Sequence, residues 1–129
     1  MALPPHILVV EDDFAIRETI FEVLDCEGFR VTCAANGAEA LLRLDEAFEA
    51  GDCPGLILLD LMMPVMDGWE FRQAQRRDPR LAAIPVIVLS AGAGMESRVA
   101  ALAPAAFIPK PFELDHLLHT VQRLFVCAA

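Results

Sequence analysis

The chain has 129 residues, and its 19 Asp and Glu against ten Lys and Arg give a formal net charge of −9. Hydrophobic residues make up 56% of it, above the roughly 45–50% of ordinary soluble domains, which excludes intrinsic disorder. The length suits one domain over residues 1–129 and excludes an enzyme with separate substrate and cofactor domains. The strong negative charge argues against nucleic-acid binding and suggests that some carboxylates hold a cation.

Three features of the sequence indicate a cytoplasmic protein. No uninterrupted apolar run approaches the roughly 18–20 residues of a membrane-spanning helix. The amino end has neither a positive region nor a small-residue cleavage site, so it does not resemble a signal peptide. The four cysteines contain no C-x-x-C pair, which favours reduced thiols over a zinc site or a disulfide framework.

Short apolar runs alternate five times with longer segments of helical period, and this alternation predicts βαβ units. The predicted strands are residues 6–10, 30–34, 56–60, 85–89 and 106–108. Because the strands are almost continuously apolar, we expect a parallel sheet covered by helices on both faces. The predicted fold is α/β, a flavodoxin-like (βα)5 doubly wound sandwich with strand order 2-1-3-4-5.

The predicted helices differ in the strength of their apolar stripes. Asn36-Gly37 introduces a helix carrying Leu41, Leu44 and Phe48, and the last helix places six apolar residues on one stripe from Leu114. The helix through Trp69 and Gln73 is expected to stop near Asp78-Pro79. The segment 91–104 is rich in alanine and glycine and has the weakest period, which predicts a short or mobile helix.

Carboxylates follow two of the predicted strands. The first strand ends in Glu11-Asp12-Asp13 and the third in Asp60, and in this fold both ends meet at the crevice where ligands bind. Acidic residues at strand ends are often solvated, and Asp13 could simply cap the next helix. Asp60 is different because apolar residues flank it on both sides, where an unpaired charge is costly. Hard oxygen ligands at this edge favour Mg²⁺.

Two other strand ends carry groups that suit a phosphoryl ligand. The fourth strand leads to Ser90, whose hydroxyl can donate to a phosphoryl oxygen, although a serine there is more often a turn residue. The fifth leads to Lys110, a point charge suited to phosphate. Because Pro109 and Pro111 restrict the backbone around it, the direction of the Lys110 side chain is well fixed.

With these strand ends taken together, the sequence resembles the receiver domain of bacterial two-component response regulators. The segments ILVVEDD, LLDLMMPVMDGWEF, VIVLSA and FIPKPF occur in the family's order and at about its spacing. The resemblance covers nearly the whole chain and implies a phosphorylation-switched signalling module. It also implies that the chain carries no output domain.

The resemblance assigns roles at the acidic crevice. Asp60 corresponds to the phosphoacceptor, which takes a phosphoryl group from a sensor histidine kinase or a histidine phosphotransfer protein. Asp12 would bind Mg²⁺ directly and Glu11 more readily through water, with Asp60 and the backbone carbonyl of Met62 completing the protein ligands.

The resemblance also assigns a switch. Ser90 stands at the Ser/Thr switch position, Phe107 at the aromatic switch position and Lys110 at the lysine of the family, and the peptide bond before Pro111 is expected to be cis. Phosphorylation would draw Ser90 inward, and Phe107 would then rotate and repack the surface of the fourth helix, fifth strand and fifth helix.

Two other functions remain open at this point. An Mg²⁺-dependent aspartyl-phosphate hydrolase would share the nucleophile and the metal, but Leu61-Met62 after Asp60 supplies no second acid/base and leaves no room for a cap. A phosphorylation-independent interaction scaffold is favoured only if the acidic crevice binds no metal. We therefore expect a protein that is not an enzyme beyond its own phosphoryl transfer and dephosphorylation, and whose downstream partner is a protein.

Overall fold

Five parallel strands form one sheet in the order β2-β1-β3-β4-β5, which confirms the predicted fold class and topology. The computed structural model describes residues 4–91 and 95–128. Its strands are β1 (His6–Val10), β2 (Arg30–Ala34), β3 (Leu56–Asp60), β4 (Val86–Ala91) and β5 (Ala106–Lys110). Its helices are α1 (Phe14–Cys26), α2 (Gly37–Glu49), α3 (Gly68–Arg77), α4 (Glu96–Ala100) and α5 (Leu114–Ala128).

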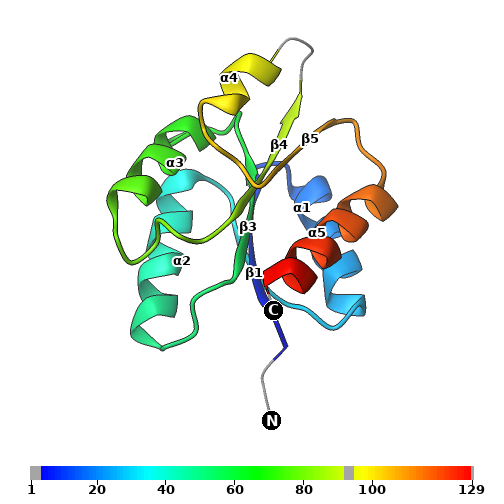
Figure 1. Ribbon diagram of the computed structural model, residues 1–129, viewed down its shortest axis with the longest axis horizontal. Helices are drawn as coiled ribbons and strands as arrows, with labels where there is room; N and C mark the ends of the chain where they lie inside the picture. The colour runs from blue at the N-terminus through cyan, green and yellow to red at the C-terminus, as the bar shows by residue number, and fades with distance from the viewer. Residues whose placement is uncertain (1–3, 92–94, 129) are drawn as a thin grey trace.

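The helices cover both faces of the sheet, α2, α3 and α4 on one and α1 and α5 on the other (Figure 1). Successive strand residues point to opposite faces, so Leu8 and Val10 pack under α2–α4 while Ile7 and Val9 pack under α1 and α5. All five residues of β3 are buried, as expected of the central strand.

Side-chain caps fix where three helices begin. The Asp13 carboxylate accepts from the backbone N–H of Ile16 at the start of α1, and Asn36 caps α2 in the same way. Asp67 and Glu70 form a reciprocal capping box at α3. Each cap follows a strand and sets the direction in which the chain leaves the sheet edge.

The observed elements differ from the predicted ones in a few places. β4 continues through Ser90, so this residue belongs to the strand and not to a turn after it. β5 continues through Pro109, which the ladder tolerates because β5 is an edge strand. Phe48 is 44% exposed instead of buried, and the Arg80 guanidinium covers its ring at 4.9 Å.

In the segment with the weakest period, the described residues form the five-residue helix α4, in line with the expected short helix. Its residues 92–94 lie outside the described part of the chain. Within the described residues, no helix combines the length and apolar character needed to cross a membrane.

Candidate functional site

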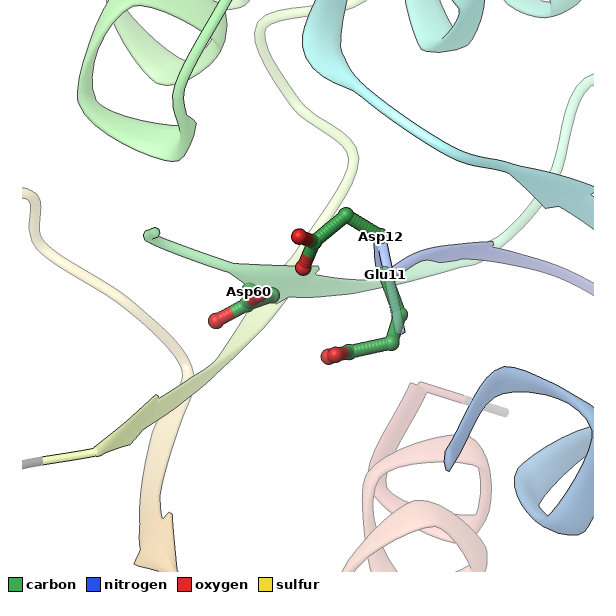
Figure 2. A group of neighbouring side chains, drawn as sticks. All are labelled: Glu11, Asp12 and Asp60. Carbon is green, nitrogen blue, oxygen red and sulfur yellow. The ribbon is translucent and has the colours of Figure 1, made fainter. Parts of the chain in front are cut away.

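Three carboxylates converge at the carboxyl edge of the sheet. Glu11 and Asp12 directly follow β1 and Asp60 ends β3, and one oxygen from each lies within 4.8 Å of the others (Figure 2). Glu11 is fully buried and Asp60 is 3% exposed, whereas Asp12 is exposed. The strand ends that the sequence picked out are therefore brought together as predicted.

Lys110 at the end of β5 reaches into the same site. Its ammonium donates to both oxygens of Glu11, at 2.9 and 3.1 Å, and lies 3.5 Å from Oδ1 of Asp60. Three carboxylates and one ammonium have a formal charge of −2, so the cluster can neutralise one divalent cation. The Lys110–Pro111 peptide bond is cis.

Burial dominates the electrostatics of this site. Burial and the neighbouring Glu11 charge raise the pKa of Asp60 to about 6, against the opposing effect of Lys110. Burial likewise raises the pKa of Glu11, again opposed by Lys110. Burial lowers the pKa of Lys110, but hydrogen bonding to Glu11 and the charges of Asp60 and Glu11 outweigh it, so the pKa lies above its ordinary value. A bound cation would therefore stabilise the ionised form of these buried carboxylates.

The donor set fits Mg²⁺. Carboxylate oxygens are the hard ligands that this ion takes, and it usually keeps several waters beside them. One oxygen from each of the three carboxylates lies within 4.8 Å of the others, so small side-chain adjustments would bring all three to one ion, and waters would fill the remaining positions.

The other predicted residues lie around the same edge. The backbone N–H of Met62 points at Oδ1 of Asp60 at 3.4 Å, while its side chain is 62% exposed. Ser90 is fully buried near the end of β4 and is paired in register with Pro109 of β5. Phe107 is partly buried and packs against the core beneath α2–α4. Ser90 and Phe107 therefore occupy adjacent strands, two register positions apart.

Two supporting residues were missed in the sequence. Arg17 of α1 donates to the backbone carbonyl of Glu11 at 2.8 Å and so fixes the turn that carries Glu11 and Asp12. Gly68 begins α3 against the end of β3, and a Cβ there would lie 2.7 Å from Cα of Leu61 and still closer to the carbonyl oxygen of Asp60. The sequence signal for Gly68 was its place directly after the Asp67 cap; no local signal marked Arg17.

A doubly wound parallel sheet with charged and polar side chains at its carboxyl edge is typical of the α/β proteins that bind a ligand at this edge. The family model of the response regulator receiver domain matches residues 7–122. The chain belongs to this family and is a receiver domain, a phosphorylation-switched signalling module of two-component systems.

Curated relatives agree with this assignment. The chain is 39% identical over 125 residues to the response regulator MprA of Mycolicibacterium vanbaalenii and 35% identical over 127 residues to the response regulator Rre1 of Synechocystis. These alignments cover 95% and 96% of the chain but 51% and 53% of the relatives. The chain thus spans about half the length of the curated relatives it matches.

Solved structures agree as well. The chemotaxis response regulator CheY4 of Vibrio cholerae is 31% identical, with a TM-score of 0.82 over 93% of this chain and 98% of that one. The receiver domain of a signal transduction histidine kinase from Syntrophus aciditrophicus is also 31% identical, with a TM-score of 0.79 over 93% and 89% of the two chains.

Proposed function

We propose that Asp60 is the phosphoacceptor and that it takes its phosphoryl group from a phosphohistidine of a sensor kinase or phosphotransfer protein. The observation that carries this proposal is the convergence of buried Asp60 with Glu11, Asp12 and Lys110 at one sheet edge. A carboxylate oxygen of Asp60 attacks phosphorus in line, a P–O bond forms and the P–N bond to histidine breaks. The imidazole leaves with the electron pair of that bond and is protonated.

The main obstacle to this step is repulsion between the Asp60 carboxylate and the anionic phosphoryl group. Bound Mg²⁺ supplies positive charge to both reactants, and Asp12, Asp60 and the Met62 carbonyl would hold it directly, with Glu11 acting through water. Lys110 supplies a second positive charge, since its ammonium is already 3.5 Å from Asp60. When a phosphoryl group is present, the ammonium can turn from Glu11 toward its oxygens.

The proposed switch begins with the same phosphoryl group. The Ser90 hydroxyl turns toward a phosphoryl oxygen, and Phe107 rotates into the space that this movement vacates. Support comes from the register, which puts the two residues on neighbouring strands, and from the partial burial of Phe107 against the α2–α4 core. The rotation repacks the surface formed by α4, β5 and α5, where a downstream protein would read the phosphorylated state.

A groove beside the site is where we place docking of the phosphate donor, an encounter that we expect in the cytoplasm. It has a volume of about 410 Å³ and lies between α1 and the start of α5, next to Lys110. Its lining is mainly apolar and includes Ile16, Ile20, Phe112 and Leu114. A helix of the donor protein laid along this groove would bring its phosphohistidine toward Asp60.

The test is to incubate the chain with Mg²⁺ and acetyl phosphate and to measure its mass. We expect a gain of one phosphoryl group that Asp60→Asn and chelation of the metal both abolish, while exposed Asp115→Asn keeps it. The absence of an adduct, or an adduct that survives Asp60→Asn, would contradict the proposal. Repeated turnover of many phosphate esters would instead support an Mg²⁺-dependent aspartyl-phosphate hydrolase.

A further inference from the structure

A second groove lies between α3 and the segment that joins α4 to β5, on the helical face shown at the upper left of Figure 1. Its volume is about 470 Å³. Trp69 and Leu102 give it an apolar part, and three arginines of α3 give it positive charge: Arg72, Arg76 and Arg77. A fourth arginine, Arg98 of α4, lies over the Trp69 ring at 4.8 Å.

These four arginines have no acidic partner among the described residues, although acidic residues outnumber basic ones 19 to ten in the chain. The one carboxylate in the groove lining, Glu70, already accepts from the Asp67 backbone in the capping box. The ion pairs of the described residues use other cations: His6, Arg30, Arg43, Arg80 and Lys110. An unpaired basic cluster is unexpected on such an acidic surface.

Structural roles explain two of the four arginines. Arg72 donates to the backbone carbonyls of Leu102 and Ala103, and Arg76 donates to that of Ala101, so both anchor the chain that follows α4. Their closeness has a cost, because burial and the positive charge of Arg76 lower the pKa of Arg72. An anion in the groove would relieve this repulsion.

The other two arginines have no such role. The side chain of Arg77 is exposed and makes no hydrogen bond or ion pair within the described part of the chain. Its position at the carboxyl end of α3 suits a cation, but that effect does not account for Arg98, which comes from another helix. Among the described residues, the Arg98 guanidinium contacts the Trp69 ring and the Met95 sulfur. Two elements therefore direct positive charge toward one apolar groove.

We propose that this groove binds an acidic, partly apolar peptide segment of a protein partner. Acidic side chains would pair with the exposed guanidinium groups, and an apolar side chain would pack between Trp69 and Leu102. A nucleic acid is a poorer occupant, because its extended phosphate backbone would meet the repulsion of a chain whose net charge is −9. A short peptide confined to the groove meets mainly the local positive charge.

The chain offers a built-in reporter, since Trp69 is its one tryptophan and it has no tyrosine. The probe is a fluorescein-labelled twelve-residue peptide of alternating Glu and Leu; the same peptide with Gln in place of Glu is its neutral control. Peptide anisotropy gives the affinity, and Trp69 emission, measured with unlabelled peptide, shows where it binds. Arg77→Glu reverses a charge of the groove, and Arg123→Glu, at an exposed position of α5, makes the same change in net charge away from the groove.

We expect the acidic peptide to bind saturably and to shift the Trp69 emission. Arg77→Glu should weaken this binding about five- to tenfold at low salt, whereas Arg123→Glu should weaken it less than about twofold. Circular dichroism checks that both variants fold. Three results would overturn the proposal: no saturable binding of the Glu peptide, equal loss in both variants, or tighter binding of a twelve-nucleotide single-stranded DNA than of the peptide.

Discussion

Asp60→Asn should stabilise the metal-free fold at neutral pH. At that pH the buried Asp60 carboxylate is charged, and the burial of this charge lowers the free energy of unfolding. The rise of the Asp60 pKa from 3.8 to about 6 corresponds to about 3 kcal/mol, since one pKa unit is worth about 1.4 kcal/mol. Asn keeps the shape of the side chain but still buries a polar group. We therefore expect a gain in the free energy of unfolding of about 1–3 kcal/mol.

The gain must depend on pH in a defined direction. The folded chain binds the Asp60 proton more tightly than the unfolded chain does, so the stability of the parent protein falls as pH rises from about 4 through about 6. Below that window the carboxyl is neutral in both states and the advantage of Asp60→Asn disappears. Above it the full advantage is present.

The assay is urea unfolding with chelator present, at about pH 7.5 and again near pH 4. Asp115→Asn, an exposed carboxylate on α5, is the matched control and should change the free energy of unfolding by less than about 0.5 kcal/mol at either pH. If Asp60→Asn gave no gain at the higher pH, or the same gain at both, the assignment of a costly buried charge to Asp60 would be wrong.

Three further predictions concern the same edge of the sheet. Lys110→Met should lower the free energy of unfolding by about 3 kcal/mol at neutral pH, because it leaves the carboxylates of Glu11 and Asp60 buried without a cation. A loss below about 1 kcal/mol in urea unfolding would contradict this prediction. Gly68→Ala should lower the free energy of unfolding by about 1–3 kcal/mol, because the added carbon would clash with the backbone at the end of β3. Gly37→Ala should lower it less, since the added carbon there would mainly meet the flexible Met66 side chain. Equal melting temperatures for the two variants would contradict this prediction. Adding Mg²⁺ should raise the melting temperature of the parent protein in a concentration-dependent way, and Asp60→Asn should reduce that rise. A melting temperature that does not depend on Mg²⁺ would contradict the proposed metal site.

The sheet was predictable because its signal is local. The inner strands are short apolar runs such as Leu56–Leu59, and buried parallel strands need that pattern whatever surrounds them. The strand ends carry the site, so Glu11, Asp12, Asp60 and Lys110 could be placed together once the topology was inferred. The strength of the contacts between them depends on side-chain packing and could not be predicted.

Long-range polar contacts explain what the sequence did not show. Arg72 and Gln75 are polar residues of α3, yet both are buried, because their donors find backbone carbonyls beyond the helix, some 30 residues away for Arg72 and six to nine for Gln75. Gln75 donates to the carbonyls of Leu81 and Ile84, and it accepts from Arg72. Hydrophobic periodicity cannot identify such residues, since their burial is stabilised by partners and not by their own apolar surface. Phe48 shows the reverse case, an apolar residue in a helical stripe that stays exposed under Arg80.

Pro109 in β5 has a consequence for how copies of this chain can associate. β5 is an edge strand, and an exposed edge is a template onto which a strand of another molecule can add. A proline has no backbone N–H to donate, and β5 ends one residue later, at Lys110. Pro109 therefore makes β5 a poorer template for sheet extension than β2, the other edge strand, which contains no proline.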